Sequence, residues 1–264
     1  MSKIKILVNC PIPIEFKAAK NVFSAQDTGK LNGCKIAEKE EKNYYLFIVQ
    51  SGPGKTRTAQ AVTSLIMEKN PDLIIDTGTC AGIQPGLSVG DMIIGKKCIE
   101  FDISGYGIPV KRIKEMELVS LFHFLPSGTR DILLQTALGA AQQEGYSVYS
   151  GFQACGEFLI NSNSLREKLY ELFHVSGSNW ETAGVFISAL RSQIPVFSLR
   201  VISDMGNKNA LREFLANAKK CSMDLYNFLK ILIENGWSNT IVEEWKKLPD
   251  SVRQKAPKTV LPGQ

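Results

Sequence analysis

Acidic, basic and hydroxyl side chains follow apolar runs at several places in this sequence. They are Glu15 in NCPIPIE, Glu181 in NWETAG, and Arg200, Ser203 and Asp204 in SLRVISD. A charged side chain inside an apolar strand is costly to bury unless it is paired, so Arg200 needs a carboxylate or a ligand, and Glu15 and Glu181 are the obvious partners. Each acid also has an ordinary explanation, because Glu181 can be a solvated residue at a helix start and Asp204 can cap a turn. If the fold brings these side chains to a common crevice, they can bind one polar ligand.

Alternating strand and helix patterns predict where these side chains lie. Runs rich in β-branched residues predict strands at 4–8, 45–49, 73–76, 92–101 and 196–203, with two further candidates at 147–153 and 156–160. Helical patterns predict helices at 56–68, 130–143, 164–173, 181–191 and 211–234. This order predicts a single α/β domain with a central mixed, largely parallel, twisted sheet flanked by helices. Ligands bind at the carboxyl ends of strands in such sheets, and the side chains named above fall at or beside those ends.

The segment SGPGKT (51–56) resembles a phosphate-binding loop. A P-loop needs a further glycine five residues before its Gly-Lys pair, because backbone amides must wrap the phosphate, and that position is Val49. The loop that remains starts a helix with free amides, which suits the close approach of another polar group. An ATPase with DLIID (72–76) as its second motif is therefore a weaker alternative, which Mg²⁺-dependent ATP hydrolysis would restore.

Composition indicates an ordinary globular protein. The chain has 264 residues, of which 44% are hydrophobic and 22% charged, and this is enough for one large domain with its own core. The net charge of +5 is mild and the basic residues are scattered, which argues against nucleic-acid binding. No apolar run approaches the roughly twenty residues that span a bilayer, and the N-terminus is typical of a first strand rather than a signal peptide. We expect a cytoplasmic protein with neither a membrane nor a nucleic-acid partner.

The cysteines and histidines do not form a metal or disulfide pattern. The six cysteines have no paired short spacing and several lie in apolar segments, which favours reduced core residues. The two histidines, His123 and His174, are not near a cysteine in the sequence, so no zinc site and no other cofactor is expected.

The end of the chain changes character after residue 235. Residues 236–264 contain a short possible helix, three prolines and little apolar periodicity. We therefore expect one domain at 1–235 and a C-terminal extension of unknown role at 236–264, packed at most on the surface.

Several motifs occur in an order and spacing that resemble a known family. The motifs are SGPGKTRTA, PDLIIDTGTCAGIQPGLSVGDMIIG, FDISGYG, GEFLIN, WETAGVF and IPVFSLRVISD. They resemble the purine nucleoside phosphorylase and uridine phosphorylase superfamily, and within it most of all the 5'-methylthioadenosine/S-adenosylhomocysteine nucleosidases. The resemblance covers residues 3–235. It implies a nucleoside phosphorylase-like fold, a homodimer, and hydrolysis of the bond between adenine, or a related purine, and a 5'-substituted ribose.

The resemblance also implies catalytic roles. Asp204 matches the acid that protonates or hydrogen-bonds N7 of the purine, and Ser203 holds it. Glu15 matches the carboxylate that takes a proton from the attacking water, with Arg200 and Thr79 orienting them. Cleaving an N-glycosidic bond needs charge relief at both ends, because the base leaves as an anion unless it is protonated and the sugar becomes cation-like. Two carboxyl groups in different protonation states supply this relief.

The family's nucleoside pocket implies further contacts. Glu181 matches the carboxylate that binds the ribose hydroxyls, where an anion also favours a developing oxocarbenium ion. The other matching positions around the nucleoside are Pro53, Thr79, Cys80, Ala81, Ile103, Tyr106, Leu159, Ile160 and Trp180. Within this set, the backbone of Ile160 would read the base edge, and Ile103 and Tyr106 belong to a part of the pocket that is donated in part across the dimer interface.

Three features depart from the family's pattern. Leu159 stands where a base-stacking aromatic is expected, with Phe158 beside it, and Trp180 stands where Met is usual. Three residues are missing between Asp204 and the helix at Leu211, where the family has a loop that covers the purine. These departures leave the substrate open and keep a non-catalytic nucleoside-binding protein as an alternative.

The sequence also bears on whether water or phosphate attacks the sugar. Uridine phosphorylase-like members carry an arginine just before the GTTG stretch, whereas this chain has Asp76, and a carboxylate there would repel phosphate. The loop NCPIPIE lacks the Gly and Arg of a phosphate loop and offers Glu15. We therefore expect hydrolysis, with phosphate-dependent cleavage as the alternative.

Overall fold

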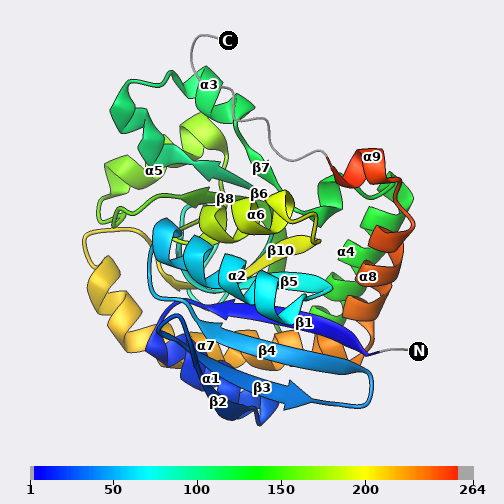
Figure 1. The fold of residues 1–264 in the computed structure, drawn as a ribbon. Coiled ribbons are helices and arrows are strands. Elements are labelled where there is room, and N and C mark those ends of the chain that lie inside the picture. Colours follow the sequence, from blue (N-terminus) through cyan, green and yellow to red (C-terminus); the bar gives the residue numbers. More distant parts are fainter. Residues whose placement is uncertain (1–2, 255–264) are drawn as a thin grey trace.

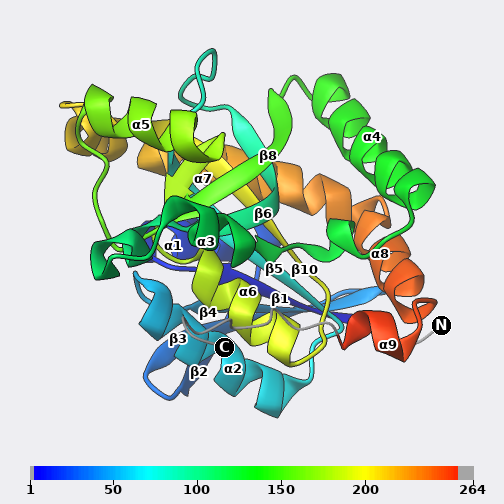
Figure 2. The same ribbon diagram turned by 90° about the horizontal axis from the view of Figure 1, so that it is seen from above.

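A mixed β-sheet runs through the centre of the computed structural model, which describes residues 3–254 except the side chain of residue 106, and helices cover both faces of the sheet (Figure 1, Figure 2). The strands are β1 (Ile4–Cys10), β2 (Gln26–Leu31), β3 (Cys34–Glu40), β4 (Tyr44–Gln50), β5 (Leu73–Gly82), β6 (Met92–Glu100), β7 (Leu118–Val119), β8 (Val148–Cys155), β9 (Gly177–Asn179) and β10 (Val196–Asp204). The helices are α1 (Pro13–Phe23), α2 (Lys55–Lys69), α3 (Val110–Glu115), α4 (Ser127–Gln143), α5 (Asn163–Phe173), α6 (Thr182–Arg191), α7 (Ala210–Glu234), α8 (Trp237–Lys246) and α9 (Asp250–Arg253), with 3₁₀-helices η1 (Phe101–Tyr106) and η2 (Leu121–His123). The predicted α/β architecture is confirmed.

The strand order brings the ends of three strands with functional side chains together. β4, β1, β5 and β10 are neighbours with parallel pairings, so β1, β5 and β10 end at the same edge of the sheet. The hairpin of β2 and β3 extends the sheet beyond β4 in antiparallel fashion. On the other side, β9, β8 and β6 lead from β5 back to β10, which pairs with both β5 and β6. This part of the sheet therefore closes on itself.

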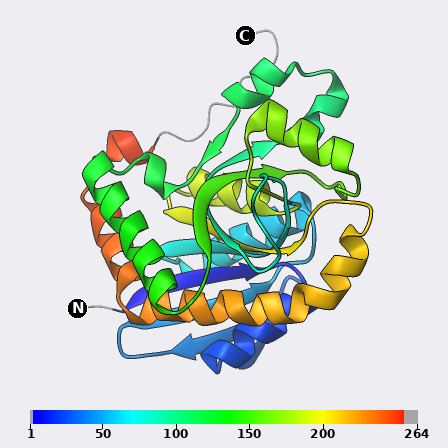
Figure 3. The same ribbon diagram turned by 180° about the vertical axis from the view of Figure 1, so that it is seen from behind.

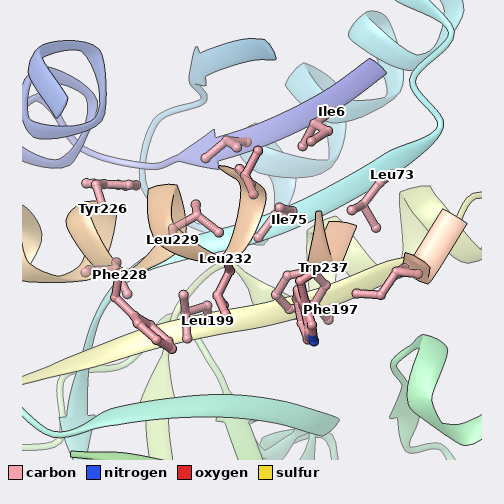
Figure 4. Close-up of a cluster of buried hydrophobic side chains, with 14 of the residues drawn as sticks. Ile6, Leu73, Ile75, Phe197, Leu199, Tyr226, Phe228, Leu229, Leu232 and Trp237 are labelled. Carbon is pink, nitrogen blue, oxygen red and sulfur yellow. The ribbon is translucent and has the colours of Figure 1, made fainter. Parts of the chain in front are cut away.

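Apolar side chains cover the central strands on both faces. On one face, α1, α7 and α8 pack over the sheet, and Figure 4 shows Ile6, Ile75 and Leu199 of the strands against Leu229 and Leu232 of α7. The long α7 crosses this face of the sheet (Figure 3). On the other face, α2 and α6 bury a second apolar cluster against the strands. Burial on both faces explains why these strands are nearly continuous apolar runs.

The chain turns from β1 directly into α1. Pro13 occupies the first turn of the helix, where a missing N–H leaves no bond unmade. Glu15 follows in the same turn and accepts the backbone N–H of Ile12 at 3.1 Å, which satisfies a free donor at the helix start. Local backbone geometry thus fixes Glu15 beside the carboxyl end of β1.

The first part of the C-terminal extension belongs to the hydrophobic core. α8 buries Trp237 and Trp245 in the cluster that also contains α7. The Trp237 ring packs edge-on against Phe197 with 5.1 Å between ring centroids, and its Nε1–H donates to the Leu133 carbonyl at 2.9 Å. The sequence suggested surface packing at most, because the short stretch shows too few periodic residues to reveal a buried face. Residues 255–264 lie outside the described part of the chain.

Two parts of the sheet differ from the sequence prediction. The predicted strand at 156–160 is instead a tight turn, in which Phe158 donates its N–H to the Gly156 carbonyl at 2.7 Å, and β8 pairs with β9. Gly156 packs against Phe101 of η1, and a Cβ there would be 2.6 Å from the ring, so only glycine fits at this position. The hairpin of β2 and β3 was not predicted, because β2 is polar and almost wholly exposed.

All six cysteines are unpaired, and all but the half-buried Cys34 lie in the interior. The predicted core position is confirmed for these five cysteines. Within residues 3–254, the helices are too short or too polar to cross a bilayer.

Candidate active site

A cavity of about 370 Å³ opens at the sheet edge where β1, β5 and β10 end. Its volume is in the range of small-molecule sites. Its walls come from these strand ends, the loop before α2, the turn after β8, the start of α6 and the start of α7. The residues that line it are Pro11, Ile12, Glu15, Pro53, Thr79, Cys80, Ala81, Phe158, Leu159, Ile160, Ser178, Asn179, Trp180, Glu181, Ser203, Asp204, Ala210, Leu211 and Phe214.

Glu15 is a buried carboxyl group held in one orientation. Its Oε1 accepts the backbone N–H of Thr79 at 2.8 Å and the Thr79 hydroxyl at 2.9 Å, while Oε2 accepts the Ile12 N–H. Burial raises the pKa of Glu15 to about 7, because desolvation outweighs the lowering effects of the Thr79 N–H and the Arg200 charge, and the Glu181 charge adds to the rise. A carboxyl group with this pKa can exchange a proton near neutral pH, as a general base must.

Asp204 is the second acid in the cavity. The Ser203 hydroxyl donates to its Oδ2 at 3.0 Å, and the Gly206 N–H donates to its Oδ1 at 3.1 Å. Burial raises the pKa of Asp204 to about 6, although these two hydrogen bonds favour the ionised form and lower it. Glu213 also raises the pKa through its charge, and it holds the loop after Asp204 by accepting the Met205 N–H at 2.8 Å.

The SGPGKT loop binds Glu181 of the cavity through a backbone amide. The Gly54 N–H, at the start of α2, donates to Glu181 Oε1 at 3.2 Å, and the next amide, that of Lys55, donates to Glu157 at 2.6 Å. The anion-binding amides of this helix start therefore hold two glutamates. The Lys55 ammonium is paired with Glu100 at the end of β6, at 3.1 Å, and with Asp102 of η1, at 2.8 Å. This loop orients a carboxylate of the cavity, which explains its resemblance to a phosphate loop.

Arg200 lies behind the cavity and is buried with Asp76. Its Nη2 and Nε donate to the two carboxylate oxygens of Asp76 at 2.6 and 3.1 Å, and its Nη1 donates to Glu181 at 3.2 Å. The expected pairing with Glu181 is thus observed. Asp76, however, is the principal partner and was missed, because its position inside β5 was interpreted only as a barrier to phosphate. In the described residues, Arg200 makes no hydrogen bond to Glu15.

Most of this chain matches a known protein family. The family model described as "Phosphorylase superfamily" matches residues 5–234, most of the chain. The chain belongs to the phosphorylase superfamily. The match ends where α7 ends, so α8 and α9 lie beyond the part shared with the family model.

Relatives of this superfamily member are similar along most of their length. A 5'-methylthioadenosine/S-adenosylhomocysteine nucleosidase from Glaesserella parasuis is 25% identical over 202 residues, which cover 74% of this chain and 85% of the relative. A protein of the same name from Haemophilus influenzae is 29% identical over 203 residues, which cover 75% and 81%.

Solved structures of the superfamily share the fold. Futalosine hydrolase from Helicobacter pylori superposes with a TM-score of 0.77 at 21% identity, covering 88% of this chain and 98% of that one. The 5'-methylthioadenosine/S-adenosylhomocysteine nucleosidase of Helicobacter pylori, solved with butyl-thio-DADMe-Immucillin-A, gives 0.78 at 20% identity, covering 89% and 100%.

Most of the site residues predicted from the sequence line the cavity described above. They are Glu15, Pro53, Thr79, Cys80, Ala81, Leu159, Ile160, Trp180, Glu181, Ser203 and Asp204. Arg200 lies behind the wall instead, and Ile103 packs with the apolar cluster beneath η1 rather than lining the cavity of its own chain. The side chain of Tyr106 lies outside the described residues.

Several lining residues were missed by the sequence analysis. They are Pro11, Ile12, Ser178, Asn179, Ala210, Leu211 and Phe214. Ile12 could have been found, because it precedes Glu15 by three residues in the same turn. Ser178 and Asn179 could not, because β9 is only three residues long and shows no pattern of its own.

The outer wall of the cavity is apolar and partly exposed. Phe158, Leu159, Trp180 and Leu211 line it with 54%, 43%, 38% and 60% of their surface accessible. The Trp180 ring is held in place, since its Nε1–H donates to the Phe158 carbonyl at 3.1 Å. Two aromatic side chains beside Leu159 can therefore contact a planar ligand without an aromatic at that position.

Asp76 was expected to place a negative charge where phosphate would bind. This carboxylate is fully buried, does not line the cavity and is neutralised by Arg200, so the prediction that it repels phosphate was wrong. The carboxyl groups that do face the cavity are Glu15, Glu181 and Asp204, and the described lining includes no Lys or Arg. Residues 3–254 also contain no group of three His, Cys, Asp or Glu side chains arranged to hold a metal ion.

Proposed function

We propose that the protein is a nucleosidase that hydrolyses the bond between adenine, or a related purine, and a 5'-substituted ribose such as that of 5'-methylthioadenosine or S-adenosylhomocysteine. The observation that carries this proposal is the convergence of Glu15, Glu181 and Asp204 on one cavity with an apolar outer wall. The names of the relatives from Glaesserella parasuis and Haemophilus influenzae support the same activity.

In the proposed mechanism, each of the three acids has a separate role. Asp204, whose raised pKa favours the protonated form below about pH 6, donates a proton to N7 of the leaving base, and the Ser203 hydroxyl orients it. Glu15 takes a proton from the water that attacks the anomeric carbon, and Thr79 fixes Glu15 through two hydrogen bonds. Glu181 binds the ribose hydroxyls, and its negative charge favours the cation-like sugar of the transition state.

Water is the proposed nucleophile rather than phosphate. A bound phosphate needs cations or free amides, and the lining between residues 3 and 254 provides acids without a lysine or an arginine. The amides at the start of α2 are already bonded to Glu181 and Glu157. Phosphate would meet three carboxyl groups and no lysine or arginine of the described lining, and Arg200 behind it is already paired with Asp76 and Glu181. Water is neutral and hydrogen-bonds to any of these acids.

A product assay tests this proposal. The purified protein is incubated with 5'-methylthioadenosine, S-adenosylhomocysteine, adenosine, inosine, futalosine and uridine, with and without phosphate. We expect free base and a free reducing sugar without phosphate. Strict phosphate dependence with a sugar 1-phosphate product would identify a phosphorylase instead. Tight nucleoside binding without base release would identify a binding protein, the alternative that Leu159, Trp180 and the short loop after Asp204 left open.

The pH dependence follows from the two raised pKa values. Glu15 must be ionised to act as a base, so its contribution rises with pH through about 7, whereas Asp204 must be protonated to act as an acid, so its contribution falls with pH above about 6. We expect a narrow bell-shaped profile of kcat/KM with a maximum between about pH 6 and 7. Steady-state assays from pH 4.5 to 9, with far-UV circular dichroism at each pH to verify the fold, measure it. A flat profile from pH 5 to 8 would contradict both assignments.

We also propose a homodimer in the cytoplasm, in which Ile103 and Tyr106 of each subunit approach the partner's cavity. Support comes from the exposed apolar rim formed by Phe158, Leu159 and Trp180, which is unusual on a monomer surface. We expect a solution mass of twice 29.2 kDa by light scattering coupled to size exclusion. A monomer at micromolar concentration with full activity would exclude a shared site.

A further inference from the structure

Arg200 and Asp76 form a bidentate ion pair behind the cavity. Arg200 on β10 donates through Nη2 and Nε to the two oxygens of Asp76 on β5, at 2.6 and 3.1 Å, and both residues are fully buried. The two strands are paired, with Arg200 opposite Gly78 and Asp76 opposite Ser198, so the pair bridges neighbouring strands on one face. Such bidentate geometry fixes the guanidinium plane as well as its position.

Both carboxylate oxygens of Asp76 accept hydrogen bonds from several residues. Besides Arg200, the Thr182 hydroxyl donates to it at 2.6 Å, the Ser198 hydroxyl at 2.9 Å and the Asn9 amide at 3.4 Å. Five donors thus converge on one carboxylate, which accepts hydrogen bonds at both of its oxygens. Through Asn9, Ser198 and Thr182, Asp76 contacts β1, β10 and the start of α6, and the last two elements adjoin Asp204 and Glu181.

The remaining edge of the guanidinium points toward the cavity acids. Arg200 Nη1 donates to Glu181 Oε2 at 3.2 Å and to the Thr79 carbonyl at 3.3 Å. It also lies close to Glu15, since a Cβ built on Gly78 would be 3.0 Å from Arg200 Nη1 and 2.8 Å from Glu15 Oε1. One buried cation therefore faces three carboxylates, and its charge is divided among them.

We propose that Asp76 is a positioning residue of the reaction centre, which acts through Arg200: it fixes the guanidinium behind Glu181 and draws the guanidinium charge away from Glu15, so that Glu15 keeps enough affinity for the proton of the attacking water. This inference rests on the proposed function of Glu15 as a base. Without Asp76, the full charge of Arg200 would act on Glu15 and stabilise its ionised form. A more stable carboxylate is a weaker base.

The other titratable groups around Glu15 do not compete for this role. Cys10 on β1 and Tyr226 on α7 face it from the core, and burial raises the pKa of the Cys10 thiol to about 12 and that of the Tyr226 hydroxyl well above its usual value. Both therefore stay neutral between pH 5 and 9. Glu181 and Arg200 are the charged neighbours of Glu15 that remain, and Asp76 contacts only the second of them.

The experiment compares the wild type with Asp76→Asn, an uncharged variant of the same shape. The Glu15 carboxyl is followed in a ¹³C NMR titration of protein labelled at glutamate side chains, with Glu15→Gln used to assign the signal. We expect the Glu15 pKa to fall by about one unit or more in Asp76→Asn. A weaker base also lowers the rate constant of the enzyme form with ionised Glu15, by up to about tenfold for each unit of pKa. An unchanged Glu15 titration would overturn the proposal and leave Asp76 as a structural counter-ion.

A matched control separates charge from packing. Ser198→Ala removes one hydrogen bond to Asp76 and leaves its charge, so the titration of Glu15 should stay as in the wild type. A shift in Ser198→Ala equal to that in Asp76→Asn would point to loosened packing and count against the proposal. If Asp76→Asn does not fold, the double variant Asp76→Asn with Arg200→Gln replaces the ion pair by two amides. The guanidinium is then absent, so the Glu15 pKa should rise above the wild-type value, and a value that stays the same or falls would overturn the proposal.

The NMR readout does not require turnover. If the wild type releases no base from any nucleoside, the proposed function fails while the coupling of Asp76 to Glu15 can still be observed. If the wild type is active and the Asp76→Asn titration is unchanged, the proposed function stands and the role of Asp76 fails.

Discussion

Replacing Asp204 with asparagine is expected to lower kcat for base release by about 10²- to 10⁴-fold, the usual contribution of a general acid. The amide cannot donate the acidic proton to N7, so the base would have to leave as an anion. Asparagine keeps the size of the side chain and can still accept the Gly206 N–H, so the cavity should keep its shape. Pre-steady-state and steady-state assays of base release measure the loss.

Stability provides the control for this variant. The folded pKa of Asp204, about 6, lies above its unfolded value, so its contribution to stability is fully present below the unfolded pKa and is lost as the pH rises through about 6. At pH 8 the asparagine variant carries no such buried charge, and its Tm should equal or exceed that of the wild type. Glu157→Gln removes a carboxylate next to the cavity that is absent from its lining, and this variant should keep nearly full activity. Turnover of Asp204→Asn within tenfold of the wild type would remove Asp204 from the mechanism.

Replacing Glu15 with glutamine is expected to cost a similar 10²- to 10⁴-fold in kcat, while the substrate Kd changes only a few-fold. The reason is that Glu15 is assigned to the water, not to the base or the ribose, so the nucleoside should still bind. Glutamine can accept both hydrogen bonds from Thr79 through its amide oxygen, but it cannot take a proton from water. Isothermal titration calorimetry and initial rates, measured on the same preparation, separate binding from chemistry.

The opposite pattern would change the assignment of Glu15. A large loss of affinity with little change in kcat would mean that Glu15 holds the substrate. In that case Glu181, the neighbouring acid, would have to be reconsidered as the base. Glu181→Gln in the same two assays gives the contrast, because the proposed ribose contact should raise Kd as well as lower kcat.

The elements with clear apolar patterns were predictable, and so was the edge at which they end. β1, β5 and β10 each contain a buried apolar run that ends in polar residues, and a parallel sheet places such ends together. Elements without such a pattern were missed. The hairpin of β2 and β3 is mostly exposed, and the packing of α8 depends on Trp237 and Trp245, whose burial is decided by α4 and β10 rather than by their own segment.

The sequence by itself determined the acids of the site, because Glu15, Glu181 and Asp204 stand beside elements whose patterns predict their positions. Only the tertiary structure decided their partners. The Gly54 amide meets Glu181 across 127 positions of the chain, and Arg200 meets Asp76 across 124. Hydrophobic periodicity describes which face of an element is buried, but not which polar group of another element faces it. Hydrogen bonds and charges act over a few ångströms, so the roles of the SGPGKT loop and of Asp76 were set by contacts that only folding creates.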